Sequence, residues 1–234
     1  MNAIKSLCLV FVLCTLSAVS VNADWHDDYD SLLRKYVTPG GVKYKAWKAN
    51  ATDVAKLHAV TEAIGSQAPA GDYNAKLAFH LNAYNAWILR AVLDNYPMKS
   101  IKDVKTLFFK RYTIKVSGRT MSFSSLENDL IREKFKEPRV HFALNCASKS
   151  CPPLYNKAFH GSTLGRALNK LTKNFVNSSR GVNTSGGSPS VSKIFKWYES
   201  DFGDVTKYIN TYRREKISGK HSYQSYDWSL NEAH

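Results

Sequence analysis

Residues 73–95 read YNAKLAFHLNAYNAWILRAVLDN and carry the most regular apolar pattern in the 234-residue chain. Large apolar side chains recur there at spacings of three and four, the period of one face of an α-helix, at Leu77, Leu81, Tyr84, Ile88 and Val92. Pro97 follows this run, and a proline favours the end of a helix because it lacks a backbone N–H. We therefore expect residues 73–95 to form a long helix that lies in the core.

The rest of the chain predicts more helix than strand. Apolar and polar residues alternate on both sides of Ser117-Gly118, which predicts a β-hairpin over 111–123. The apolar run 140–145 has the length of a strand, and the aromatic tail 221–230 is a candidate for another. Helices are expected to end at Tyr36 and to cover 52–64, 163–177, 192–200 and 203–212, with a Ser/Gly-rich loop at 178–188. The fold class is α+β, predominantly helical with a small, mostly antiparallel sheet.

One more helix is expected directly after the hairpin. Ser124-Ser125-Leu126-Glu127 matches a capping box, in which Ser124 is the N-cap and the Glu127 carboxylate bonds back to its N–H. This role explains Glu127 without chemistry, and a part in acid–base catalysis is the alternative.

Composition and the first residues indicate an exported globular protein. The chain has 33 Lys and Arg against 19 Asp and Glu, a net charge of +14, and 44% hydrophobic residues, which excludes disordered, collagen-like and multi-span membrane proteins. Residues 1–23 place Lys5 before a short apolar stretch that ends in small residues, as in a secretory signal cleaved after Ala23. Removing these 23 residues leaves 211, with Lys5 lost and a charge of +13. We expect 24–234 to be one domain, secreted or periplasmic and without a transmembrane segment; a eukaryotic host could glycosylate Asn50, Asn177 and Asn183.

The cysteines pose the main question about function. Cleavage of the signal would leave only Cys146 and Cys151, in a protein bound for an oxidising compartment. Three states are open: a structural disulfide, a nucleophilic thiol, and a redox-active disulfide. No second Cys or His pair stands at zinc-ligand spacing, so no metal or other cofactor is predicted. Ser148 and Ser150 lack the glycines of a nucleophile elbow, which argues against a serine hydrolase.

Four stretches together resemble a known family. They are 79–86 (FHLNAYNA), 141–153 (HFALNCASKSCPP), 192–202 (SKIFKWYESDF) and 226–231 (YDWSLN). In order and spacing they resemble the domain of unknown function 547 family over about residues 30–232. One departure is His80, where the family pattern has Trp. The resemblance implies a fold grouping but no substrate.

The first functional hypothesis is an exported thiol-dependent hydrolase or acyltransferase, like papain and the transglutaminases by analogy only. Asn82 and Asn85 share one face of the long helix, so they need buried polar partners, either structural groups or a catalytic histidine or oxyanion. If 141–146 is extended, His141 lies roughly 17 Å from Cys146. Cys151 is then the better nucleophile, since its loop can fold back towards His141 and Asn145.

The alternative hypothesis is a non-catalytic binding module with a structural Cys146–Cys151 disulfide. Residues 99–119 contain seven basic residues and a single acidic one. The basic residues are Lys99, Lys102, Lys105, Lys110, Arg111, Lys115 and Arg119. Anionic envelope or matrix polymers are the expected partners of such a surface in an exported protein. No nucleic-acid-binding motif accompanies the run, so no specific nucleic acid is expected.

Overall fold

The computed structural model describes residues 24–104 and 108–233. The predicted signal 1–23 and Lys105 lie outside the described residues. The long helix predicted over 73–95 is confirmed as α4 (Tyr73–Asn95). Every residue from 77 to 89 is buried, which is the pattern of a helix enclosed on all sides rather than packed on one face. α4 therefore forms the centre of the molecule.

Asp and Asn side chains cap the N-termini of the first three long helices. The side chains of Asp24, Asn50 and Asp72 accept backbone N–H groups at the starts of α1 (Trp25–Tyr36), α3 (Ala51–Ser66) and α4. Such caps satisfy N–H groups that have no partner within the helix. The helices predicted to end at Tyr36 and to cover 52–64 are confirmed, although α3 continues through Gly65 to Ser66.

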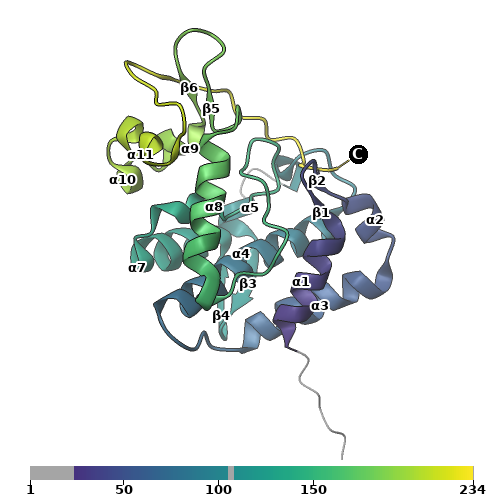
Figure 1. Cartoon of the computed structure of the whole chain (residues 1–234). Helices are drawn as coiled ribbons and strands as arrows, with labels where there is room; N and C mark the ends of the chain where they lie inside the picture. The colour runs from purple at the N-terminus through teal and green to yellow at the C-terminus, as the bar shows by residue number, and fades with distance from the viewer. Residues whose placement is uncertain (1–23, 105–107, 234) are drawn as a thin grey trace, which may run out of the picture.

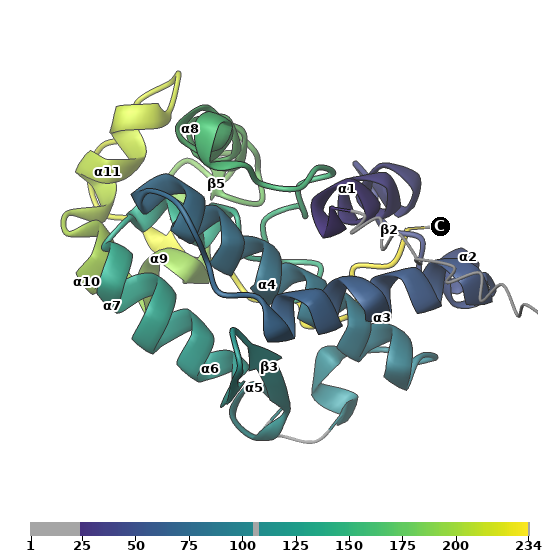
Figure 2. The ribbon, with the colours of Figure 1, turned by 90° about the horizontal axis from the view of Figure 1, so that it is seen from below.

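Other elements cover α4 on opposite sides. α1 and α8 (Leu164–Val176) lie on one side of α4, and α5 (Phe108–Arg111) and the β3–β4 hairpin lie on the other (Figure 2). The hairpin predicted over 111–123 is confirmed, with β3 (Thr113–Val116) antiparallel to β4 (Arg119–Ser122). The helix predicted at 163–177 is confirmed as α8.

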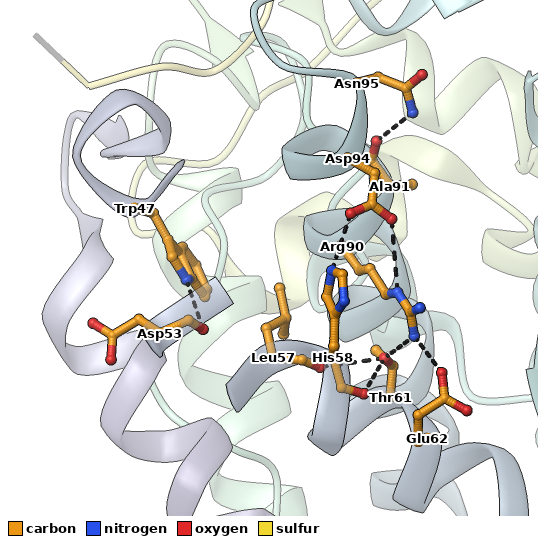
Figure 3. Close-up of polar contacts among 10 residues, drawn as sticks. All are labelled: Trp47, Asp53, Leu57, His58, Thr61, Glu62, Arg90, Ala91, Asp94 and Asn95. Carbon is orange, nitrogen blue, oxygen red and sulfur yellow. Dashed lines mark hydrogen bonds and ion pairs between the residues drawn. The ribbon is translucent and has the colours of Figure 1, made fainter. Parts of the chain in front are cut away.

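Polar contacts join the outer surfaces of α3 and α4 (Figure 3). The Arg90 guanidinium on α4 donates to Thr61 Oγ1 at 2.7 Å and to Glu62 Oε1 at 2.6 Å. His58 Nε2 lies 3.0 Å from Asp94 Oδ1. The charged side chains of this group are partly exposed, so their ion pairs contribute little to stability compared with the apolar contacts beneath them.

The C-terminal third forms a smaller second cluster of apolar side chains. α9 (Lys193–Trp197), α10 (Glu199–Phe202) and α11 (Val205–Tyr212) confirm the helices expected there and gather at one end of the molecule (Figure 1). The loop expected at 178–188 contains a strand, β5 (Val182–Asn183), which pairs antiparallel with β6 (Ser190–Val191). β6 also pairs with β7 (Ser222–Tyr223), in parallel. The α+β class, predominantly helical with small and mostly antiparallel sheets, is confirmed.

The rest of the C-terminal segment crosses the molecule to the β1–β2 hairpin (Figure 1). β1 (Val37–Thr38) and β2 (Gly41–Val42) precede the short helix α2 (Tyr44–Lys48). On the way, Leu230 N–H donates to the Lys99 carbonyl and Asn231 N–H to the Ala147 carbonyl. Val42 N–H then donates to the Asn231 carbonyl. Only two residues of the tail form the expected strand, and the remainder joins three distant parts of the chain. Over the described residues, no helix combines the length and apolar character needed to cross a membrane.

The prediction of a strand over 140–145 is wrong. Residues 138–142 form a 3-10 helix (η3, Pro138–Phe142), and the chain continues to Cys146 without regular structure. Pro138 occupies the first turn, where its missing N–H costs nothing, and the Glu137 side chain accepts the Arg139 N–H. The segment is buried on all sides, and periodicity alone does not distinguish such a run from a strand.

The prediction of a capping box with Ser124 as the N-cap is also wrong. Ser122 is the N-cap of α6 (Phe123–Ser125), and its hydroxyl accepts the Ser125 N–H. The helix continues as a π-helix (η2, Leu126–Arg132) and ends in α7 (Glu133–Phe135). Glu127 is therefore free of the capping role, and its carboxylate bonds to Tyr198 instead.

Candidate functional site

A cavity of about 290 Å³ lies where the four family-like stretches meet. Tyr84 comes from α4, and five residues come from the segment that contains the two cysteines. α9 with its C-cap Tyr198 and the C-terminal segment supply most of the aromatic side chains. The lining residues are Tyr84, Phe109, Ser124, Glu127, Asn128, His141, Leu144, Cys146, Cys151, Pro152, Ile194, Trp197, Tyr198, Tyr226 and Trp228.

Two sulfur atoms form part of the cavity wall. Cys146 and Cys151 are joined as a disulfide, with their Cα atoms 6.2 Å apart. Cys146 is half-buried, whereas Cys151 is only 4% exposed. The Cys146 N–H donates to Cys151 Sγ at 3.0 Å, and the Tyr226 hydroxyl lies 3.3 Å from both sulfurs. Burial raises the pKa of Tyr226 to about 12, so this hydroxyl keeps its proton and is a donor to sulfur.

The cavity residue His141 is paired with an aspartate. His141 Nε2 is 2.7 Å from Asp201 Oδ2, and its ring stacks on Tyr198 with the centroids 4.0 Å apart. Arg132 donates to both carboxylate oxygens of Asp201, at 2.7 and 2.8 Å. The hydrogen bond from His141, followed by those from Arg132, holds the pKa of Asp201 well below its usual value. Asp201 therefore stays ionised and fixes the orientation of the imidazole ring.

The π-helix supplies a second acidic group. The Tyr198 hydroxyl donates to Glu127 Oε1 at 2.5 Å, and burial, followed by the charge of Glu127, raises the pKa of Tyr84. Arg132 lies about one turn of the π-helix after Glu127. Its guanidinium donates both to Asn128 Oδ1 and to Asp201. Helices with π geometry occur often at functional sites, because the wider turn changes which side chains share a face. Here it directs Glu127, Asn128 and Arg132 towards one region.

Sequence reasoning missed several of these residues. Asp201, Tyr198 and Tyr226 lie within the family-like stretches, so those stretches were the available signal. Arg132 carries no sequence signal, because its partner Asp201 is 69 positions away.

The three asparagines named from the sequence bond to backbone groups. Asn82 donates to and accepts from Phe159, at 2.8 Å in both cases. Asn85 donates to the Ala143 carbonyl and accepts the Asn145 N–H, both at 2.9 Å. Asn145 donates to the Pro152 carbonyl at 2.8 Å. None of these amides is among the groups that line the cavity. Asn85 and Asn145 hold in place the segment that carries His141 and the cysteines, and Asn82 holds the chain at Phe159.

The substitution Asn85→Leu is expected to lower the free energy of unfolding by about 2–4 kcal/mol. The leucine would leave the buried Ala143 carbonyl and Asn145 N–H without partners, and each unpaired group costs about 1–3 kcal/mol. Asn95→Leu is the matched control on the same helix, because Asn95 is exposed, and its expected change is within about 0.5 kcal/mol. Urea unfolding measures both, and equal losses would contradict the structural role of Asn85.

The basic residues named from the sequence lie outside the cavity lining. Those that the structure describes are exposed: Lys99, Lys102, Lys110, Arg111, Lys115 and Arg119. Lys102 Nζ lies 4.5 Å from the ring centroid of Trp228, so this residue contacts a ring of the cavity wall without itself lining the cavity. In the part of the chain that the structure covers, no group of three His, Cys, Asp or Glu side chains is arranged to hold a metal ion.

Residues 70–176 match the sequence model of the family described as Protein of unknown function, DUF547. This match supports a DUF547 domain over that part of the chain. No curated protein and no solved structure matches the chain. The DUF547 match includes Tyr84, Glu127, His141 and both cysteines, and the segments beyond it complete the cavity with α9 and the C-terminal aromatic residues. The family resemblance seen in the sequence is confirmed over residues 70–176, which contain two of the four stretches, 79–86 and 141–153.

Proposed function

We propose that the cavity is the active site of an exported, thiol-dependent hydrolase or acyltransferase, which works when the Cys146–Cys151 disulfide is reduced. One observation carries the proposal: a half-buried sulfur and a histidine oriented by an aspartate line the same cavity. These are the two parts that a thiol nucleophile needs, the attacking atom and a base beside it. The folds of papain and the transglutaminases enter only as an analogy of this arrangement.

The proposal assigns the attack to Cys146. The sequence argument favoured Cys151, because an extended 141–146 segment would place Cys146 roughly 17 Å from His141. The segment is not extended, because a 3-10 helix runs to Phe142 and irregular backbone follows it. His141 and Cys146 line the same cavity, so this objection no longer applies. Cys146 is the more exposed of the two cysteine residues, and Cys151 becomes its disulfide partner in the oxidised protein.

The reaction requires reduction and then a proton transfer. A dithiol supplies two electrons and two protons to the disulfide, leaves as its own disulfide, and frees both cysteine thiols. Because Asp201 accepts the Nε2 proton of His141, Nδ1 is the basic nitrogen and accepts the Cys146 proton. The sulfur then bonds to the acyl carbon, the leaving group departs with the proton from His141, and water or another acceptor releases the acyl group from the thioester.

Two single-cysteine variants test the assignment without a reductant. In Cys151→Ser the free thiol is Cys146, and in Cys146→Ser it is Cys151. We expect iodoacetamide at neutral pH to alkylate Cys151→Ser at least about tenfold faster, because reactivity follows exposure and thiolate content. His141→Ala in the Cys151→Ser background should remove most of this advantage. Equal rates in the two cysteine variants, or a rate independent of His141, would contradict the proposal.

A second candidate function is non-catalytic binding of anionic envelope or matrix polymers, with the disulfide as a structural bond. The exposure of the described basic residues between 99 and 119 favours it. Such binding weakens as the salt concentration rises, because the charges are exposed and screened. Secretion, or export to a periplasm, is part of both proposals.

A further inference from the structure

The charged side chain that lines the cavity is acidic, although the protein as a whole is basic. The chain carries a net charge of +14, yet no Lys or Arg is among the described residues that line the cavity, and Glu127 is the only carboxylate there. No Lys or Arg in the described chain forms an ion pair with Glu127, whereas Asp201 nearby is paired with Arg132. A half-buried carboxylate with only hydroxyl partners leaves a site for a cation from outside.

The other walls are aromatic. The rings of Trp197, Tyr226 and Trp228 form one cluster, with centroid separations of 4.7 Å for Trp197–Tyr226, 4.6 Å for Tyr226–Trp228 and 5.7 Å for Trp197–Trp228. Tyr84 and Tyr198 complete the lining near Glu127. Trp197 is 45% exposed, although such a side chain is normally buried. An exposed tryptophan at a concave surface is typical of a binding site.

Cations already contact two of these rings from outside the lining. Lys102 Nζ lies 4.5 Å from the centroid of Trp228, and the Arg132 guanidinium carbon lies 4.8 Å from that of Tyr198. The ring faces attract positive charge through their quadrupoles, most strongly where water is excluded. Tyr198 is stacked on His141 as well as contacted by Arg132. The attraction for a further cation therefore comes from the other aromatic rings of the lining, together with the charge of Glu127.

We infer that the cavity binds an alkylammonium group, and that the substrate of the proposed enzyme carries one. Aromatic walls with a single carboxylate suit a weakly hydrated, methylated ammonium better than a strongly hydrated one, because aromatic faces replace few water hydrogen bonds. The statement that the substrate carries this group rests on the proposed function. The binding of an alkylammonium group does not, because it is independent of the cysteine chemistry.

The test compares choline with 3,3-dimethylbutan-1-ol, its neutral isostere, on the oxidised full-length protein by calorimetry. We expect choline to bind at least about tenfold more tightly. Ethylammonium is the third probe and distinguishes a primary from a methylated ammonium; we expect it to bind more weakly than choline. Equal binding of choline and the isostere would overturn the inference, and tighter binding of ethylammonium would overturn the preference for methylated groups.

Two variants locate the binding. Glu127→Gln should remove most of the preference for choline over the isostere, whereas Glu133→Gln is the matched control, because Glu133 is exposed and outside the lining. Choline should also slow the alkylation of Cys146 in the Cys151→Ser variant. A preference that survives Glu127→Gln would contradict the inference. If choline binds but Cys146 is unreactive, the ammonium site stands and the proposed function fails.

Discussion

The substitution Gly41→Ala is expected to lower the free energy of unfolding by about 2–4 kcal/mol, although it adds a single methyl group. A Cβ at this position would lie 2.2 Å from the Asn231 carbonyl oxygen, which accepts the Val42 N–H. Gly41 also has φ +132°, a region that residues with a side chain rarely adopt. Because the obstacle is backbone, the C-terminal segment has to move, and a forced fit of this kind costs at least about 1–3 kcal/mol.

Gly40→Ala is the control within the same turn. The nearest atom to its added Cβ is Thr38 Oγ1 at 3.7 Å, an ordinary contact, so the expected change is within about 0.5 kcal/mol. Urea unfolding of both variants measures the difference. Near-ultraviolet circular dichroism should change only for Gly41→Ala, because its displaced segment carries Tyr226 and Trp228. If the two variants have equal stability, the close packing of the C-terminal segment on β2 is wrong.

The sequence predicted the fold best where local rules and burial agree. α4 matched its predicted bounds, because Asp72 is a capping residue, Pro97 ends the pattern, and the apolar spacing between them is regular. The β3–β4 hairpin was equally clear, since alternation and a Gly turn both indicate it. The 3-10 helix at 138–142 was mistaken for a strand, because a fully buried run loses the periodicity that distinguishes the two.

The candidate site was predictable only in part. The four stretches that resemble the family contain Tyr84, His141, Cys146 and Tyr226. The distances between these residues depend on the tertiary fold, which the sequence patterns do not give. Glu127 was explained as a cap because the π-helix that turns it into the cavity has no sequence signature that we could use. The asparagines were recognised as needing buried partners, and the partners proved to be backbone groups up to 77 positions away.

The substitution Asp201→Asn is expected to slow the reaction of Cys146 by roughly two to three orders of magnitude, the usual cost of misplacing a catalytic base. The carboxylate offers two acceptor oxygens, which Arg132 and His141 share. An amide offers one oxygen, so Arg132 and His141 would compete for it. His141 is then free to carry its proton on Nδ1, where it cannot accept one from Cys146.

The same variant is expected to lose about 2 kcal/mol of stability at neutral pH, since charged hydrogen bonds to Asp201 are lost. The pKa of Asp201 is depressed in the folded protein from an ordinary value near 3.8, so its stabilising contribution is fully present above that pH. It is lost as the pH falls from there through the lower pKa of the folded state. The stability difference between the wild type and Asp201→Asn should therefore shrink on acidification below about pH 4.

The decisive measurement is the pH dependence of Cys146 alkylation in the Cys151→Ser background, with and without Asp201→Asn. A positioning role predicts a shifted and weakened rate profile, whereas a purely structural role lowers stability and leaves the profile of the folded protein unchanged. Asp129→Asn is the control, because Asp129 lies on the same π-helix as Arg132 but is exposed, and it should change neither quantity. An unchanged profile in folded Asp201→Asn would mean that His141 does not act on Cys146 through this aspartate, and the proposed acid–base chemistry would be wrong.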